Sequence, residues 1–146
     1  MLKCSTSLWS ADLTNLAAEM KRVEPFTERW HLDVADGHYV KNLLFFPDLV
    51  AQLRKRSTKP FEVHLMVTDP LGWIDPFVEA GADIILFCFD AAQNPGEVSQ
   101  AIKDRGVADG PEQQEVALVA FEDERAPRER DPAALAVASF PDRETH

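Results

Sequence analysis

The sequence predicts an α/β protein built on a parallel sheet. Three observations over residues 1–106 support this class: short apolar runs alternate with amphipathic segments, the amphipathic segments repeat their apolar residues at helical spacing, and Gly or Pro separates many of the segments. Regular alternation of strands and helices implies parallel strands joined by right-handed crossovers. The pattern alone leaves two architectures open, an open doubly wound sheet and a closed barrel.

The first strand and helix are predicted from the opening of the chain. Residues 2–8 form an apolar run that indicates a strand. Apolar residues then recur every three or four positions over residues 13–23, which indicates a helix. Ser10 and Asp12 offer side-chain oxygens that would cap this helix, and Pro25 ends it.

The second unit is a strand, a long loop and a helix. The strand is predicted at residues 29–34. A loop at 36–47 follows, interrupted by Gly37 and closed by Pro47. The helix is predicted at 48–56, where the apolar residues lie on one side.

Two further units repeat the pattern. Strands are predicted at residues 61–67 and 84–89, the second of which is almost continuously apolar, as is typical of a parallel strand covered on both faces. Helices are predicted at 73–80 and 96–105. Gly81 supplies the permissive backbone that the end of the first of these helices needs.

The composition changes after residue 106. Residues 1–106 hold 15 acidic residues and 11 Lys or Arg, whereas residues 107–146 hold 10 acidic residues and 4 Arg. One more strand fits residues 116–121, and the remainder is rich in Pro, Ala, Arg and Glu. We therefore divide the chain into an ordered α/β part, residues 1–106, and a weakly ordered tail, residues 107–146, with a terminal strand and helix as the alternative for the tail.

Size, charge and cysteine content restrict the class of protein. The chain has 146 residues and a net charge of −10, which disfavours binding to nucleic acid or to anionic membranes. No run reaches the roughly 18 apolar residues of a membrane span, and the opening lacks the features of a signal peptide. Cys4 and Cys88 lie in apolar runs and indicate buried, reduced thiols. We expect a cytoplasmic protein.

Three side chains on neighbouring strands form a candidate metal site. His31 and Asp33 are two residues apart in a strand and therefore face the same way, and His64 lies on the next strand. Ionisable groups inside an apolar sheet are costly unless they are paired or bind a metal. Two imidazoles and a carboxylate suit a divalent ion such as Zn, Fe, Mn or Co. The alternative is a buried hydrogen-bonded network without a metal.

Several motifs, in the same order along the chain, resemble those of the ribulose-phosphate 3-epimerase family. The resemblance extends from about residue 5 to residue 106. It is carried by SLWSADLTNL at residues 7–16, HLDVADGHYV at 31–40, VHLMV at 63–67 and EAGAD at 79–83.

The resemblance implies a fold and a set of roles. It implies a (β/α)8 barrel, of which this chain would hold about four N-terminal βα units followed by an atypical tail, because a complete barrel takes about 200–250 residues. His31, Asp33 and His64 would bind a divalent metal ion, and Asp33 would also be one of two acid/base carboxylates. Ser7, His64 and Met66 would lie beside the substrate, a small sugar phosphate.

The implied activity is a metal-dependent ketose-phosphate 3-epimerase of the ribulose 5-phosphate/xylulose 5-phosphate type. Asp33 would remove the proton at C3, and the metal would stabilise the resulting enediolate. The second acid/base, an aspartate on the seventh strand of the family, and the phosphate-binding glycines have no counterpart in this sequence. We therefore expect impaired turnover, with a non-catalytic remnant or interaction module as the alternative.

The sequence also departs from the family motifs. Ala35 stands in place of a methionine, Lys41 in place of a proline and Phe46 in place of a glycine, and Cys88 and Asp90 stand where the family has H-x-E. These differences suggest a divergent subgroup with a different sugar. A half-barrel would expose its interior and two sheet edges, which favours association of copies of the chain. The change of composition after residue 106 also suggests a shift of reading frame, which sequencing of the locus would test.

Overall fold

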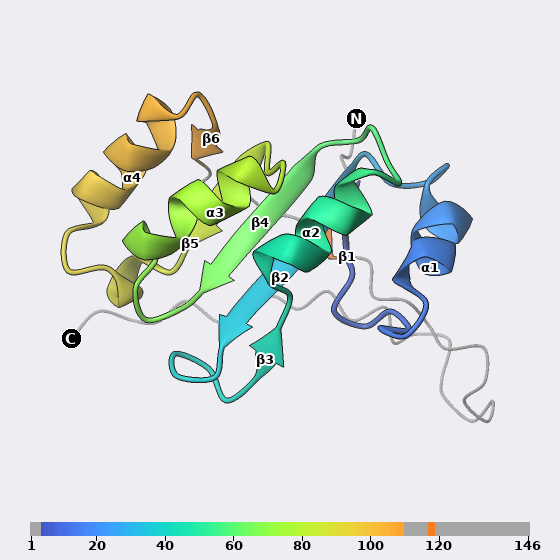
Figure 1. Cartoon of the computed structure of the whole chain (residues 1–146), viewed down its shortest axis with the longest axis horizontal. Helices are drawn as coiled ribbons and strands as arrows, with labels where there is room; N and C mark the ends of the chain where they lie inside the picture. Colours follow the sequence, from blue (N-terminus) through green and yellow to red (C-terminus); the bar gives the residue numbers. More distant parts are fainter. Residues whose placement is uncertain (1–3, 110–116, 119–146) are drawn as a thin grey trace.

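The protein forms a mainly parallel sheet with helices between successive strands (Figure 1). This computed structural model describes residues 4–109 and 117–118. In that part of the chain the sheet has seven strands, of which six follow the order β6-β5-β4-β2-β1-β7 and β3 pairs with β2. The strands are β1 (Cys4–Ser7), β2 (Arg29–Asp36), β3 (Leu43–Leu44), β4 (Phe61–Met66), β5 (Ile84–Phe87), β6 (Ala108–Asp109) and β7 (Ala117–Leu118).

A helix follows each of the four long parallel strands, so the predicted α/β class is confirmed. Two short 3-10 turns come before the third and fourth helices. The helical segments are α1 (Leu16–Val23), α2 (Pro47–Arg54), η1 (Leu71–Trp73), α3 (Ile74–Glu79), η2 (Phe89–Ala91) and α4 (Pro95–Asp104).

The apolar core lies between the helices and one face of the sheet. Trp30 and Leu32 of β2 are fully buried on this face, together with Phe61 of β4. Buried residues of all four helices belong to the same apolar cluster. A doubly wound sheet has helices on both faces, whereas a barrel has them all on the outside. The one-sided core is therefore consistent with the first part of a (β/α)8 barrel.

Two local features differ from the predicted elements. Helix α1 begins at Leu16 because Asp12 accepts hydrogen bonds from the backbone N–H and hydroxyl of Thr14, which forms a separate turn instead of a cap. The predicted loop 36–47 contains β3, which pairs antiparallel with the end of β2. A two-residue strand has too few positions to show a periodicity, so the sequence pattern does not reveal it.

The sheet continues beyond residue 106. Strand β6 pairs with β5, and β7 pairs with β1, both in parallel. The edges of β1 and β5 that were expected to be free are thus partly paired, because later segments of the chain supply hydrogen-bonding partners. The remainder of the predicted tail, residues 110–116 and 119–146, lies outside the described residues, so its predicted weak order and off-frame origin stay predictions.

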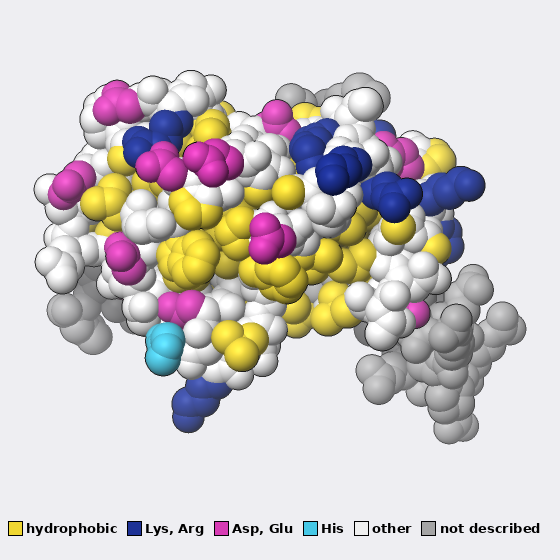
Figure 2. All heavy atoms as spheres, in the orientation of Figure 1, with side chains coloured by type: hydrophobic (Ala, Val, Ile, Leu, Met, Phe, Trp, Pro, Cys, Tyr) yellow, Lys and Arg dark blue, Asp and Glu magenta, His cyan; other side chains and the backbone are white. Residues whose placement is uncertain are grey.

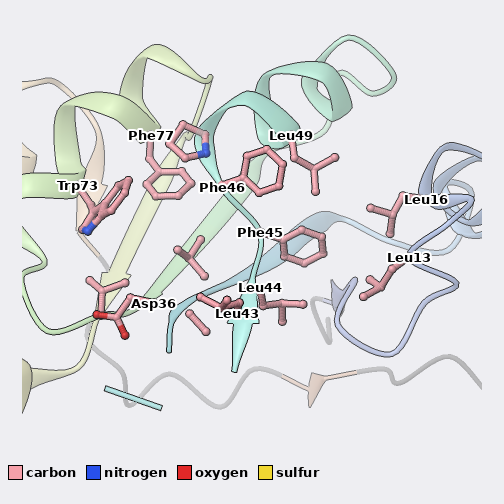
Figure 3. Close-up of a pocket in the computed structure, with 14 residues that line it drawn as sticks. Leu13, Leu16, Asp36, Leu43, Leu44, Phe45, Phe46, Leu49, Trp73 and Phe77 are labelled. Carbon is pink, nitrogen blue, oxygen red and sulfur yellow. The ribbon is translucent and has the colours of Figure 1, made fainter. Parts of the chain in front are cut away.

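An apolar cavity of about 560 Å³ lies on the helical side of the sheet. Its lining comes from α1, α2, α3 and the β2–β3 region, and Figure 2 shows apolar side chains gathered on this face. Leu13, Leu43 and Phe46 are at least half exposed, and Figure 3 shows them around the cavity with Asp36 at one end. Among the described residues that line the cavity, Asp36 carries the one charge.

Within the described part of the chain, no helix has the length and apolar character needed to cross a membrane.

Candidate functional site

Polar side chains from three strands meet on the face of the sheet opposite the helices. The strand register places Ser7 of β1 beside His31 of β2, and Asp33 of β2 beside His64 of β4. Alternate residues of a strand point to opposite faces, so the side chains that flank His31, Asp33 and His64 are apolar ones that pack under the helices. Ser7, His31 and Asp33 are at most 8% exposed, in contrast to the open interior expected for a half-barrel. These polar groups pair with one another.

Asp33 lies at the centre of this cluster. Its Oδ1 is 3.2 Å from Nε2 of His31 and 3.7 Å from Nδ1 of His64. Its Oδ2 accepts a hydrogen bond of 2.7 Å from the hydroxyl of Ser7. The two imidazole rings lie close together, with centroids 5.5 Å apart. The structure therefore brings together Ser7, His31, Asp33 and His64 around one carboxylate.

The spacing of these groups suits a divalent ion. One atom from each of His31, Asp33 and His64 lies within 4.8 Å of the others. Ligands that share one tetrahedral ion at bonds of about 2.1 Å are about 3.4 Å apart, so only small side-chain shifts would be needed. Two nitrogens and one oxygen form a donor set that accepts Zn, Fe, Mn or Co.

The pKa values of the three groups reflect their mutual contacts. Burial raises the pKa of Asp33, but its interactions with His31 and His64 outweigh burial, and the pKa lies well below the usual range. Burial lowers the pKa of His64, but its interactions with Asp33 and Cys88 raise that pKa to about 9. The pKa of His31 is likewise raised, because contacts with Asp33 and Glu62 outweigh its burial. At neutral pH the cluster thus holds an ionised Asp33 carboxylate beside a protonated His64 imidazole.

Glu62 is a member of the cluster that the sequence prediction missed. Its carboxylate is 2.8 Å from Nδ1 of His31 and receives a hydrogen bond of 2.6 Å from Arg29. Glu62 is 2% exposed. It precedes His64 by two residues and so faces the same way. The sequence did contain a signal for this residue: Glu62 is an acidic residue two positions before a candidate ligand in an otherwise apolar strand.

Comparison with known proteins identifies the family. The ribulose-phosphate 3 epimerase family matches residues 3–114, which is more than half of the chain. The chain belongs to the ribulose-phosphate 3-epimerase family. The resemblance that its motifs predicted is therefore confirmed.

The relatives are ribulose-phosphate 3-epimerases from several organisms. That of Treponema pallidum is 42% identical over 105 residues, covering 71% of this chain and 48% of the relative. That of Eremothecium gossypii is 40% identical over 113 residues, covering 69% of this chain and 47% of the relative. That of Bacillus subtilis is 38% identical over 111 residues, covering 75% and 51% respectively. The chain spans about half the length of the curated relatives it matches.

Two of the departures from the epimerase motifs lie side by side, next to His64. Ala35 and Cys88 form a small buried cluster with Met66. The Cys88 sulfur is 3.7 Å from Nε2 of His64, on the side of the ring away from Asp33. Both cysteines of the chain are free thiols. The substitutions therefore change the surroundings of His64 and leave His31, Asp33 and His64 together as a candidate metal group.

The loops above this cluster are joined by hydrogen bonds. The hydroxyl of Tyr39 donates a bond of 2.6 Å to Asp90, which links the segment after β2 to the segment after β5. Asp36 accepts bonds from the backbone N–H groups of His38 and Tyr39 and from both the N–H and the hydroxyl of Thr68. These contacts fix the loops at the carboxyl ends of the strands, where barrel enzymes have their active sites.

We expect metal affinity to rise with pH up to about pH 9, because below that pH the His64 imidazole holds a proton that a metal ion must displace. The opposite trend is expected for the stability of the metal-free protein. The pKa of His64 is raised above its ordinary value of 6.5, so its stabilising contribution is complete below pH 6.5 and is lost as the pH rises through about 9.

Calorimetric titration with Mn²⁺ and urea unfolding, each from about pH 6 to about pH 8.5, would measure the two trends. The exposed His38 provides a control, because His38→Asn should leave both trends unchanged. A metal affinity that does not change with pH would contradict this prediction.

Proposed function

We propose that the chain carries the metal-binding and proton-abstracting part of a ketose-phosphate 3-epimerase. The observation that supports this best is the single carboxylate, Asp33, held between two imidazoles and a serine hydroxyl on the inner face of a barrel-type sheet. His31, Asp33 and His64 would hold the ion. When bound, the ion supplies Lewis-acid stabilisation of negative charge that develops on the substrate oxygens.

The base in this proposal is Asp33. Its low pKa keeps it ionised at neutral pH, and the hydrogen bond from Ser7 holds Oδ2 in place. A proton at C3 of a ketose phosphate is acidic because the C2 carbonyl is adjacent, so a fixed carboxylate can remove it. Ser7 and Met66 would border the sugar. The substitutions at Ala35 and Cys88 beside Met66 are where we expect the preference for a particular sugar to differ from that of the relatives.

An alternative is a non-catalytic member of the family. Among the described residues, the carboxylates that contact the imidazoles are Asp33 and Glu62, and Glu62 is engaged with Arg29. A second acid/base for inversion is therefore not evident in the described part of the chain. We also propose that copies of the chain associate through the edges of the sheet and that the protein is cytoplasmic.

Isotope exchange would separate the two alternatives. We expect the metal-loaded chain to exchange the C3 proton of ribulose 5-phosphate with D₂O, followed by proton NMR, because removal and return of a proton on one face needs only Asp33. Formation of xylulose 5-phosphate should be much slower, since inversion needs a second acid on the opposite face. A chelator should stop the exchange. Metal binding without C3 exchange would favour the non-catalytic alternative.

A further inference from the structure

The apolar cavity on the helical side of the sheet has the features of a docking surface. It has a volume of about 560 Å³ and is lined from α1, α2, α3 and the β2–β3 region. Leu43 is 82% exposed, Phe46 is 56% exposed and Leu13 is 50% exposed. Figure 3 shows these side chains around the cavity. Apolar groups gathered in one exposed hollow typically mark a surface that binds another segment of protein.

The charges near the cavity are acidic. Asp36 lines it, and Asp12 and Asp48 are direct sequence neighbours of lining residues. Among the described residues, no Lys or Arg is a direct neighbour of a lining residue. The segment that fits such a surface has an apolar stretch with arginine or lysine close by. A second copy of the cavity would instead bring the same acidic residues face to face, which costs free energy.

Strand β7 brings the later part of the chain to this region. It pairs in parallel with β1, with Leu118 beside Ser5. The chain therefore leaves β7 in the direction in which β1 runs. After β1 the chain continues to Leu13 and Leu16, which line the cavity. The residues that follow Leu118 thus start beside the strand that leads into the cavity lining.

One segment after β7 has the required apolar character. Residues 133–140, AALAVASF, are apolar except for a single serine. Asp131 and Pro132 precede them, and an aspartate followed by a proline is a typical start of a helix. A helix of this length is only marginally stable by itself, so it needs a surface on which to bury its apolar side chains.

The charge and length of the surrounding sequence also fit. Residues 125–143 hold four Arg and three acidic residues, whereas residues 107–146 as a whole hold 4 Arg and 10 acidic residues. The arginines are thus concentrated around the apolar segment. The connecting residues 119–130 can span up to about 40 Å when extended, which exceeds the diameter of a small domain.

We propose that residues 131–140 dock into the apolar cavity of their own chain. Their apolar side chains cover Leu13, Leu43 and Phe46, and the flanking arginines lie near Asp36. The proposal does not depend on the proposed function, because the cavity is on the helical side of the sheet and the candidate metal group is on the opposite face.

A nitroxide spin label at residue 139 tests the contact directly. The label is attached to Ser139→Cys in a full chain that also carries Cys4→Ser and Cys88→Ala, so that no other thiol reacts. We expect the label to broaden the backbone amide signal of Leu43 in a ¹H–¹⁵N NMR spectrum. The signal of Gln100 should stay sharp, because α4 contributes no residue to the described lining of the cavity.

Mixing separates docking within one chain from docking between copies. The mixture contains spin-labelled chain without ¹⁵N and ¹⁵N-enriched chain without a label, and we expect no broadening at Leu43. Broadening there would show that a second copy occupies the cavity and would overturn the proposal. Equal broadening of Leu43 and Gln100 in the first sample, or none at either residue, would overturn it as well.

Urea unfolding of the full chain with its natural cysteines gives a second readout. We expect Leu43→Gln and Leu135→Gln each to lower the folding equilibrium constant roughly ten-fold, and the double variant to lower it no further, because either change removes the same contact. Phe89→Gln is the control, since Phe89 is 71% exposed and lies outside the lining. Without an occupant, Leu43→Gln should be as neutral as this control, and that result would contradict the proposal.

Discussion

Replacing Asp33 with asparagine should remove divalent-metal binding from the chain. The carboxylate is the anionic ligand of the candidate group and the common partner of both imidazoles. We expect a loss of more than about 100-fold in affinity for Co²⁺, the upper end of the effect seen when only a supporting partner is lost. Exchange of the C3 proton should disappear as well. Calorimetry and NMR exchange measure the two effects.

The same variant has a second signature. Because interactions with Asp33 and Cys88 together raise the pKa of His64 to about 9, that pKa should fall in Asp33→Asn. The exposed Asp48, in the first turn of α2, offers a matched control: Asp48→Asn should change neither the metal affinity nor this pKa. Full metal affinity in Asp33→Asn would exclude the site described above.

Replacing Trp30 with alanine should have the largest effect on stability. Trp30 is fully buried between β2 and the helices, and its indole N–H donates a 3.0 Å bond to Ser57, which in turn donates to Glu24. Large-to-small changes of buried aromatic residues cost about 3–5 kcal/mol. Since whole domains are stable by about 5–15 kcal/mol, urea unfolding should show a midpoint shifted far towards zero, or a chain that is unfolded from the start.

Phe26 is the matched control for this prediction. It is an aromatic residue in the connection before β2, and it is 77% exposed. Phe26→Ala should change the free energy of unfolding by less than about 0.5 kcal/mol. Equal effects of the two substitutions would mean that Trp30 is not part of the folded core.

The parts of the fold with a long pattern were predictable from the sequence. Alternation of strands and helices, and the common face of His31 and Asp33, follow from spacing alone. The short strands β3 and β6 were not predicted, since two residues carry no period. That only one face of the sheet is covered by helices does not follow from the periodicity, and the resemblance to a known family supplied that step before the structure confirmed it.

The candidate site was predicted less completely than the fold. The sequence indicates which side chains on one strand share a face. It does not indicate which residues of two neighbouring strands lie beside each other, because that depends on the register of the strands. The pairing of His31 with Glu62 is of this kind. A strand pattern is equally compatible with an Arg29 side chain that points into solvent. The pairing of Arg29 with Glu62 is therefore seen only in the three-dimensional structure.

All three candidate ligands belong to one crossover, β2–α2–β4, between residues 31 and 64. During synthesis, all three ligands are therefore made before α4 and β6. An ion captured at that stage would close a single short loop, for which the entropy cost is modest. Such an ion would cross-link β2 and β4 in the growing polypeptide and would help the β2–α2–β4 crossover to form before the later strands are made.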